Sequence, residues 1–274
     1  MGGLMEKTVE EKEQALIHEL ETLPRGILAF SGGVDSTYLL YQAHQVMGKR
    51  LLAVTMRLAS MPEAELEDAK KLAVSIGARH EVISMNQFDI DGFAENPENR
   101  CYLCKHFLFS YLREKAAAEG YDCVMDGTNR DDTAVFRPGR KALSELGIQS
   151  PLRAVGLTKR DIRRLSKKAG LPTWSKPSFP CMATRFPYHE RITREKLARV
   201  EAAENVLRQE GFTQFRVRSH GDLARIEVPG EDMQALFDKK ERVCASLTAL
   251  GFLYVTMDLF GFASGSMDRP LERK

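Results

Sequence analysis

Two cysteines three positions apart, Cys101 and Cys104, stand in the segment NRCYLCK. Thiolates at this spacing can bind a zinc ion, bind an iron–sulfur cluster or form a redox couple. A structural zinc ion usually has four protein ligands, and the sequence offers no second C-x-x-C and no paired histidines to complete them. A thioredoxin-like pair stays open, although the motif here lies between the irregular segment FAENPENR and a predicted helix. Two cysteines at a helix start can also simply pack in the interior.

A third cysteine, Cys181, lies between prolines in the segment KPSFPCMATRFP, close in sequence to Arg185 and Arg191. A thiol near cations is expected to have a lowered pKa, and therefore more nucleophilic and metal-binding thiolate. The remaining two, Cys123 and Cys244, occur in apolar strand or helix patterns and are expected to pack in the core.

The segment AFSGGVDSTYLL, at positions 29–40, contains the residue types that bind phosphate. Its glycines let the backbone approach a ligand closely, and the N–H groups of the helix that begins there attract an anion. It is not a Walker loop, because no Lys-Ser or Lys-Thr follows the glycines. An ordinary strand-to-helix turn capped by Asp or Ser is the alternative. The candidate phosphate ligands are Ser31, Gly32, Gly33, Asp35, Ser36 and Thr37.

A second polar segment, MDGTNRDD at positions 125–132, follows an apolar run that we predict to be a strand. Ligands of open parallel sheets bind at the carboxyl ends of the strands. The segment could therefore contact a nucleotide or Mg²⁺, and the alternative is an ordinary Asx-type turn. The candidate ligands are Asp126, Thr128, Asn129 and Asp132.

The elements that must position these groups follow from the hydrophobic pattern. Short apolar runs predict buried parallel strands at 26–30, 50–56, 80–85 and 123–128. Helical patterns lie between them at 36–47, 62–76 and 102–118, after an amphipathic lead-in helix at 8–22. This alternation predicts an α/β fold with a doubly wound parallel sheet.

The pattern changes after about residue 150. Four prolines between 172 and 187 predict a long irregular connection, which in compact proteins is often functional. A helix at 193–210, strands FRVRSH and LARIEV, a helix at 231–250 and a strand FLYVTMDL then predict a smaller C-terminal α+β domain. We expect a first domain at 1–170, an active-site loop at 171–192 and a substrate or oligomerisation domain at 193–274.

In the first of these strands, the alternation places Arg216 and Arg218 on one face. Two neighbouring guanidinium groups suit a phosphate or two carboxylates, and an exposed strand face with solvated arginines is the alternative. Glu204 and Glu227 are candidates for metal or subunit contacts.

Composition limits the classes of partner. Forty basic and 38 acidic side chains give a formal net charge of +2, too balanced for a polyanion along a whole face, so no nucleic acid is expected. The sequence shows no apolar run of membrane-spanning length and no signal peptide. Five unevenly spaced cysteines do not suit a secreted disulfide framework, which predicts a reducing cytoplasm.

The Ser-Gly-Gly-Val-Asp-Ser string resembles the signature of PP-loop ATP pyrophosphatases, which include GMP synthetase, NAD synthetase and tRNA thiolation enzymes. Together with DGTN, Lys176-Pro177-Ser178, Pro180-Cys181 and RVRSHGDLARIEVP, it resembles the LarE family over nearly the whole chain. These are the ATP-dependent sulfur transferases of nickel-pincer nucleotide biosynthesis.

The resemblance implies a reaction. ATP adenylates a carboxylate of pyridinium-3,5-biscarboxylic acid mononucleotide, and sulfur then replaces the activated oxygen to give a thiocarboxylate. It also implies a homo-oligomer, a hexamer in this family. The implied ATP and Mg²⁺ site comprises the phosphate loop with Asp126, Thr128, Lys176 and Arg185; Cys181, Asp35 and Ser36 are the implied catalytic residues, and Arg216 and Arg218 the implied substrate ligands.

The sulfur source distinguishes two groups within the family. In the sacrificial group, the cysteine that matches Cys181 donates its own sulfur and is left as dehydroalanine. This sequence departs from that pattern, because Cys101, Cys104 and Cys181 resemble the ligands of the group that holds a [4Fe-4S] cluster. A cluster-dependent tRNA thiolation enzyme and an ATP-binding regulatory module are the alternatives. Balanced charge and the lack of an evident zinc ribbon count against tRNA.

Overall fold

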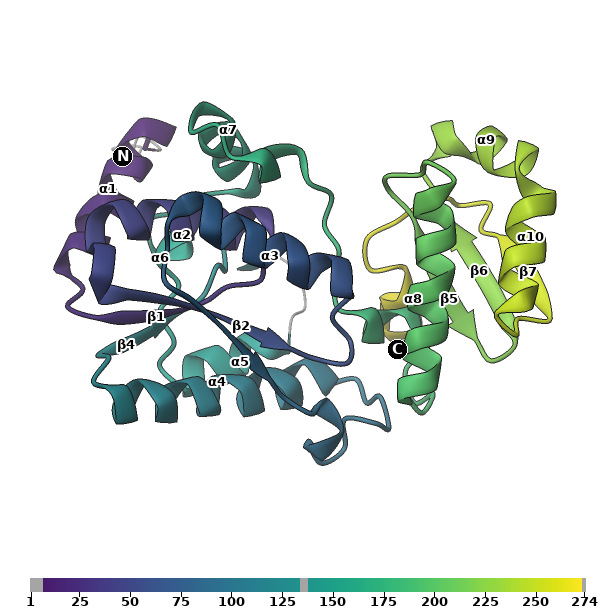
Figure 1. Cartoon of the computed structure of the whole chain (residues 1–274), viewed down its shortest axis with the longest axis horizontal. Coiled ribbons are helices and arrows are strands. Elements are labelled where there is room, and N and C mark those ends of the chain that lie inside the picture. Colours follow the sequence, from purple (N-terminus) through teal and green to yellow (C-terminus); the bar gives the residue numbers. More distant parts are fainter. Residues whose placement is uncertain (1–6, 134–137, 273–274) are drawn as a thin grey trace, which may run out of the picture. The chain divides into compact units, whose positions relative to one another are not determined.

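The computed structural model describes residues 7–133 and 138–272 (Figure 1). The chain divides into two compact units, the first comprising Met1–Ile90 and Asn99–Ser178 and the second comprising Asp91–Glu98 and Phe179–Lys274. Within the described residues, no helix has the length and apolar character needed to cross a membrane.

The first unit is built on a parallel sheet of four strands in the order β3-β2-β1-β4. The strands are β1 (Gly26–Ala29), β2 (Leu51–Arg57), β3 (His80–Ser84) and β4 (Cys123–Met125). Ile27 pairs with Leu52 on one side and with Val124 on the other, so β1 is central. The predicted α/β fold with its parallel sheet is confirmed, although β4 is shorter than the predicted strand.

Helices cover both faces of this sheet (Figure 1), because its central strands are apolar on both sides. Leu28 and Ala53 join the core under α1, α2, α3 and α7, whereas Ile27 and Val54 join the core under α4 and α5. The helices of this unit are α1 (Val9–Thr22), α2 (Val34–Met47), α3 (Glu63–Ile76), α4 (Arg100–Glu119), α5 (Gly139–Glu145), α6 (Pro151–Ala154) and α7 (Lys159–Lys168).

The second unit is a small sheet with helices packed against it. Its strands β5 (Arg216–His220), β6 (Leu223–Glu227) and β7 (Tyr254–Met257) lie in that order, with β5 antiparallel and β7 parallel to β6. Its helices are α8 (Arg194–Gln209), α9 (Met233–Asp238), α10 (Lys240–Ala249) and the short α11 (Arg269–Glu272).

The single helix predicted at 231–250 is wrong, because the chain bends at Lys239 between α9 and α10. Lys239 has φ −97° and ψ 7°, outside the helical range, and its ammonium group pairs with Glu210 at 3.5 Å. The hydrophobic pattern of the sequence continues across the bend and therefore does not mark it. The ion pair at the bend joins Lys239 to a residue far away in sequence, which a local pattern does not reveal.

Residues 91–98 belong to the second unit although 99–178 follow them in the first. The amide of Ile192 donates to the Ala94 carbonyl at 2.7 Å, and the amide of His189 donates to the Asn96 carbonyl at 2.9 Å. The Asn96 side chain donates to the Pro187 carbonyl at 2.6 Å. This short segment is therefore fastened along the chain that follows Cys181.

Candidate active site

The phosphate loop leaves β1 at its carboxyl end and is closed by its own hydroxyl groups. Ser36 Oγ donates to the Gly33 carbonyl at 3.2 Å and accepts from the Ser31 amide at 3.3 Å, while the two serine hydroxyls lie 3.0 Å apart. The N-cap of α2 is Gly33, which has no side chain to cap the helix. The first-turn N–H groups therefore have no capping side chain, which favours the anion-binding reading over a capped turn.

Two glycines are required by close packing at this loop. Gly32 has φ +70°, and a Cβ there would lie 3.0 Å from the Ala69 Cβ. A Cβ on Gly127 would lie 3.0 Å from the Ser36 nitrogen and 3.1 Å from its Cα. The loop after β4 thus lies directly against the phosphate loop, as expected for two strand ends that meet at one edge of a sheet.

The loop after β4 is held by a buried carboxylate. Asp126 is 6% exposed and accepts hydrogen bonds from Ser150 Oγ at 2.6 Å and from the Thr128 hydroxyl. The side-chain oxygen Oδ1 of Asn129 accepts a hydrogen bond from the Asp131 backbone amide at 2.8 Å. The backbone amide of Asn129 donates to Asp132 Oδ2 at 3.1 Å. The predicted ligands of this loop therefore form a local network that also contains Asx-type turns.

Asp35 makes an ion pair that sequence reasoning missed. Its Oδ2 lies 2.6 Å from Lys159 Nζ at the start of α7. Burial raises the pKa of Asp35 above its ordinary value; Lys159 opposes this increase and Asp132 adds to it. The side-chain amide of Asn129 also lowers the pKa of Asp35. The other carboxylate oxygen, Asp35 Oδ1, is buried and makes no hydrogen bond of normal geometry among the described residues.

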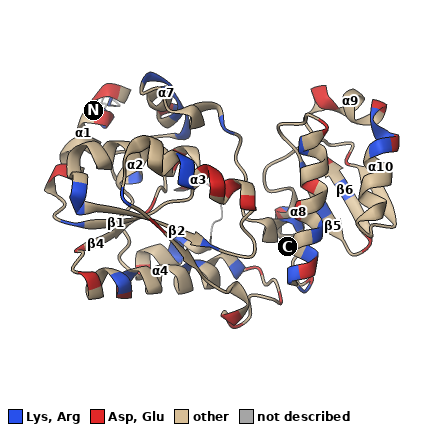
Figure 2. Cartoon of the chain, viewed as in Figure 1, with Lys and Arg blue, Asp and Glu red and all other residues tan. Residues whose placement is uncertain are grey.

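Lys176, predicted to bind ATP, forms ion pairs with Glu65 at 3.0 Å and Asp68 at 2.9 Å on α3. The acidic first half of α3 and the basic α7 are visible as red and blue ribbon in Figure 2. Arg163 of α7 donates to the carbonyls of Trp174 at 2.6 Å and Lys176 at 2.8 Å. The start of the proline-containing connection is therefore fastened to two helices of the first unit.

Cys101 and Cys104 lie in the first turns of α4, where Cys101 is exposed and Cys104 is half-buried. Cys104 Sγ accepts a hydrogen bond from the Gln87 amide at 3.4 Å, and Gln87 Oε1 accepts from the Ser60 amide at 3.0 Å. By contrast, burial raises the pKa of the Cys123 thiol to about 11, which suits the packing role expected for it.

Cys181 is exposed and directly precedes the short 3₁₀ helix Met182–Arg185 in the second unit. Its carbonyl accepts hydrogen bonds from the Thr184 amide at 3.0 Å and the Thr184 hydroxyl at 2.8 Å. Of the three cysteines predicted to bind a cluster, Cys101 and Cys104 thus belong to the first unit and Cys181 to the second. Within the described parts of the chain, no group of three or more His, Cys, Asp and Glu residues could hold a metal ion.

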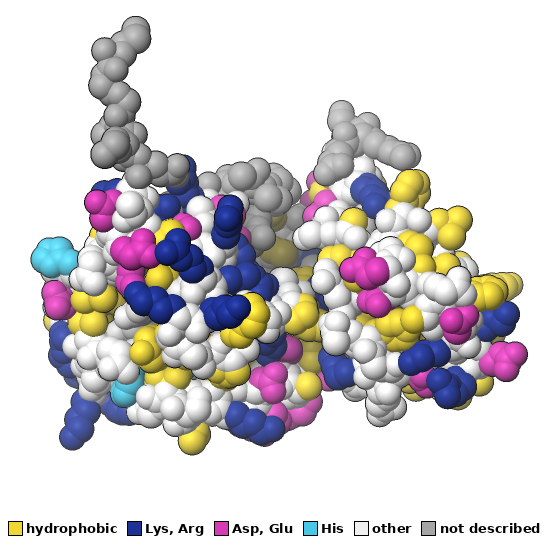
Figure 3. All heavy atoms as spheres, turned by 90° about the horizontal axis from the view of Figure 1, so that it is seen from above, with side chains coloured by type: hydrophobic (Ala, Val, Ile, Leu, Met, Phe, Trp, Pro, Cys, Tyr) yellow, Lys and Arg dark blue, Asp and Glu magenta, His cyan; other side chains and the backbone are white. Residues whose placement is uncertain are grey.

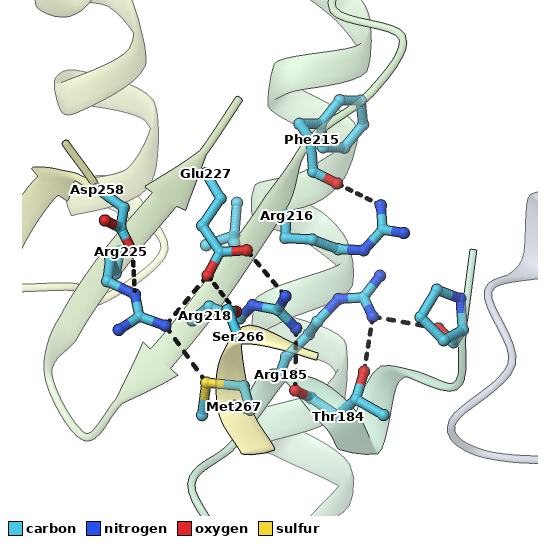
Figure 4. A network of polar contacts seen from close by, with 12 residues as sticks. Thr184, Arg185, Phe215, Arg216, Arg218, Arg225, Glu227, Asp258, Ser266 and Met267 are labelled. Carbon is cyan, nitrogen blue, oxygen red and sulfur yellow. Dashed lines mark hydrogen bonds and ion pairs between the residues drawn. The ribbon is translucent and has the colours of Figure 1, made fainter. Parts of the chain in front are cut away.

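Arginines and carboxylates of the second unit form a buried network (Figure 4). Arg185 is 0% exposed and makes a bidentate ion pair with Glu204, with distances of 2.7 and 3.1 Å. A further guanidinium nitrogen donates to the Pro180 carbonyl at 3.1 Å, directly before Cys181. Arg185 therefore supports the backbone that carries the thiol.

The alternative of an exposed strand face for Arg216 and Arg218 is wrong, since they are 2% and 4% exposed. Arg218 pairs with Glu227 at 2.8 Å and donates to the Thr184 carbonyl at 3.1 Å. Glu227 also accepts from Arg225 at 3.1 Å and from Ser266 at 2.6 Å. Its carboxylate is therefore neutralised within the unit.

Arg216 lies between the rings of Phe179 and Phe262, with its guanidinium carbon 5.0 Å from each ring centroid. Burial, followed by the nearby charge of Arg185, lowers its pKa to about 9. The Nε of Arg218 is also buried, with no hydrogen-bond partner among residues 7–133 and 138–272. Three arginines, at 185, 216 and 218, face two carboxylates, at 204 and 227, so one positive charge is in excess and suits an anion.

The chain is similar to known proteins along most of its length. The family model described as queuosine biosynthesis protein QueC matches residues 25–94, which include the phosphate loop. An uncharacterized protein of Synechocystis sp. is 43% identical over 97% of this chain and 100% of its own length. The pyridinium-3,5-bisthiocarboxylic acid mononucleotide synthase of Lactiplantibacillus plantarum is 37% identical over 97% of both chains. An uncharacterized protein of Methanocaldococcus jannaschii is 31% identical over 85% of this chain and 88% of its own.

Proposed function

This chain belongs to the LarE family of PP-loop enzymes, and we propose that it is an ATP-dependent sulfur transferase acting on pyridinium-3,5-biscarboxylic acid mononucleotide. The observation that carries the proposal is 37% identity to the synthase over 97% of both chains. The phosphate loop, with its hydroxyl-closed backbone and uncapped helix start, supports the use of ATP.

The first step is adenylation of a substrate carboxylate. A carboxylate oxygen forms a bond to the α-phosphorus, and the bond from that phosphorus to the β-phosphate oxygen breaks, so pyrophosphate leaves with the electron pair. Backbone N–H groups at the start of α2 and the hydroxyls of Ser31 and Ser36 are the groups we propose to bind the phosphates, since the helix start has no side-chain cap and the two hydroxyls lie together. A bound Mg²⁺ would neutralise phosphate charge, and the buried Asp35 Oδ1 is a carboxylate oxygen of the kind that holds it.

The substrate carries a phosphate and two carboxylates, and Arg216 with Arg218 are the groups we propose to bind its anionic part. Their site has an excess of positive charge, and the Nε–H of Arg218 has no hydrogen-bond partner in the part of the chain that the structure describes. Binding of a phosphate there would satisfy that donor and offset the mutual repulsion of the arginines.

In the second step, sulfur replaces the adenylated oxygen. In the sacrificial route, Cys181 Sγ attacks the activated carbonyl carbon, and AMP leaves with the electron pair of the broken carbon–oxygen bond. Loss of the Cα proton with cleavage of the Cβ–Sγ bond then leaves dehydroalanine at position 181 and the thiocarboxylate on the product. The exposure of Cys181 supports its access to substrate.

The test uses the purified protein with ATP, Mg²⁺ and the biscarboxylic acid mononucleotide. We expect AMP and pyrophosphate in equal amounts, together with the thiocarboxylate identified by mass spectrometry. Cys181→Ala should retain AMP and pyrophosphate formation but give no thiocarboxylate, whereas Cys244→Ala serves as the matched control. Thiocarboxylate from Cys181→Ala would refute the role proposed for this thiol, and a wild type that releases no pyrophosphate would refute the function.

We further propose that Cys101, Cys104 and Cys181 hold a [4Fe-4S] cluster. Thiolates are the usual ligands of such clusters, and the exposed Cys101 with the half-buried Cys104 in the first turns of α4 suit them. The bound cluster would offer one iron without a protein ligand, to which an additional sulfide can bind.

Iron and acid-labile sulfide content after anaerobic preparation tests the cluster. We expect about four irons per wild-type chain and their loss in Cys104→Ala, with Cys244→Ala unchanged. No iron in any of the three would exclude the cluster and favour the sacrificial route. Intact-mass measurement after one turnover then distinguishes the routes, because only sacrifice removes the sulfur of Cys181.

The oligomeric state and the cellular compartment of this protein are also proposals. We propose a homo-oligomer, a hexamer as in the family, and Leu253, Tyr254, Leu259 and Phe260 are exposed apolar side chains in the second unit that support association. None of the five cysteines, all of which the structure describes, is in a disulfide, which suits a reducing cytoplasm. Light scattering coupled to gel filtration measures the oligomeric state, and a tRNA shift assay without a complex would support a small-molecule substrate.

A further inference from the structure

The peptide that joins β1 to the phosphate loop is held by a side chain of the neighbouring strand. β1 ends at Ala29, and the carbonyl of Phe30 accepts a hydrogen bond from the Thr55 hydroxyl on β2 at 2.7 Å. The other end of the same peptide, the Ser31 amide, donates to Ser36 Oγ at 3.3 Å. Both polar groups of this peptide are therefore bonded to side-chain hydroxyls, which fix its orientation where the chain leaves the sheet.

The Thr55 hydroxyl is itself held by His80, the first residue of β3, whose ring nitrogen Nε2 lies 2.8 Å from the hydroxyl oxygen. A hydroxyl has one hydrogen, and the Phe30 carbonyl can only accept. The hydroxyl hydrogen therefore lies on the bond to the carbonyl, and Nε2 of His80 must donate. Burial, followed by the charge of Lys70, lowers the pKa of His80, so the ring is neutral at neutral pH and carries its one hydrogen on Nε2.

The relay of His80, Thr55 and Phe30 crosses three adjacent strands and is buried where it meets the loop. Phe30 and Thr55 are 2% and 1% exposed, and the rings of His80 and Phe30 make an edge contact with their centroids 5.7 Å apart. Basic and acidic side chains lie on the surface of the first unit (Figure 3), whereas Phe30 belongs to its apolar core. Water does not readily replace a donor that is lost at such a position.

We propose that Thr55 and His80 are positioning residues for ATP binding: His80 fixes the Thr55 hydroxyl, and that hydroxyl fixes the peptide from which the phosphate loop starts. The inference rests on the proposed use of ATP by this loop. Without the hydroxyl, the buried Phe30 carbonyl loses its donor, and the peptide turns toward another one. The Ser31 amide then turns away from Ser36 Oγ, and the hydroxyls that close the loop lose their arrangement. Neither positioning residue needs to touch the nucleotide.

Calorimetric titration with ATP tests the assignment, with substitutions that separate the hydrogen bonds from the packing. Thr55→Val keeps the side-chain shape without the hydroxyl and should bind ATP about 10-fold more weakly, whereas Thr55→Ser should stay within about twofold of wild type. His80→Phe keeps a ring without the N–H and should bind about threefold more weakly, and His80→Gln, which supplies an N–H, should recover most of this loss. Thr256→Val is the matched control, since it removes the same kind of hydrogen bond, to the Ala224 carbonyl at 3.1 Å, in the second unit.

Hydrogen exchange distinguishes positioning of the loop from a general loss of stability. In Thr55→Val without ATP, the Ser31 amide should exchange about 10-fold faster, while the Ala53 amide, which donates to the Arg79 carbonyl at 2.9 Å, should keep its rate. Equal acceleration at both amides, unchanged ATP affinity in Thr55→Val, or equally weak binding by Thr55→Ser would overturn the proposal. If wild type binds ATP but releases no pyrophosphate with substrate, the proposed function fails while these comparisons still decide the role of the relay. A wild type that binds no ATP would refute both.

Discussion

Arg216 is buried, and burial disfavours the charged form of its guanidinium group. It is 2% exposed, lies between two phenylalanine rings, and has Arg185 and Arg218 as charged neighbours that lower its pKa. Buried charges are often less favourable for stability than aliphatic side chains of similar volume. Such a residue is explained if it binds an anionic ligand, and substrate phosphate is the ligand we propose.

Arg216→Met should raise the free energy of unfolding by about 1–3 kcal/mol and abolish substrate binding. The control is Arg242→Met, whose side chain is 69% exposed and pairs with Glu210, and whose effect should stay below about 0.5 kcal/mol. Urea unfolding measures the free energy, and calorimetry measures substrate affinity. A less stable variant, or one that still binds substrate, would contradict this reading.

The pH dependence of this gain follows from the lowered pKa of Arg216. Its folded pKa of about 9 lies below the ordinary value of 12.5, so the guanidinium is charged in both states at pH 6 and 8. The gain should therefore be equal at these two pH values. Above about pH 9, the unfolded chain binds more protons, wild-type stability rises with pH from this group, and the gain should shrink.

At the scale of elements, the site depends on the contact between the loops that follow β1 and β4. Gly127 has little space for a side chain, because a Cβ would lie 3.0 Å from the Ser36 nitrogen, and backbone yields less easily than a flexible side chain. The geometry of the phosphate loop is thus coupled to a turn that is distant in sequence.

Gly127→Ala should therefore lower the free energy of unfolding by about 1–3 kcal/mol and weaken ATP binding. Gly230→Ala is the control, since a Cβ there meets nothing within 4 Å and the residue has no positive φ. Thermal unfolding and ATP titration measure the two effects. Unchanged ATP affinity in Gly127→Ala would show that the phosphate loop does not need this contact.

At the scale of the whole molecule, the chain crosses between its two units more than once. Segment 91–98 interrupts the first unit and is fastened to the second by Asn96, a buried residue with a left-handed φ of 55°. Asparagine tolerates this conformation better than most residues. Its side chain also holds the Pro187 carbonyl, in the stretch that follows Cys181.

Asn96→Ala should lower the stability of the second unit by about 1–3 kcal/mol, through backbone strain and lost hydrogen bonds. Asn96→Gly should lower it less, because glycine adopts this φ freely and only the side-chain bonds are lost. Hydrogen exchange at the His189 and Ile192 amides, which bond to this segment, reports the effect. ATP affinity should stay unchanged, and a parallel loss would contradict the assignment of 91–98 to the second unit.

The sequence alone determined the features that depend on neighbouring residues. Apolar runs and helical spacing predicted the parallel strands and the α/β fold, and the Ser-Gly-Gly-Val-Asp-Ser string predicted a phosphate loop whose backbone suits an anion. These features follow from chain geometry within a few residues, so a local pattern is enough to specify them.

Only the tertiary structure decided which distant charges meet. Lys159 reaches Asp35 across 124 positions, and Glu204 and Glu227 pair with Arg185 and Arg218. The strand face of Arg216 and Arg218, for which solvent exposure was the alternative to substrate binding, is buried. No periodicity encodes these pairs, because a lysine at a helix start looks the same whether it faces solvent or a phosphate loop. Packing of the helices and strands fixes its neighbours, and those neighbours set its charge environment and its chemistry.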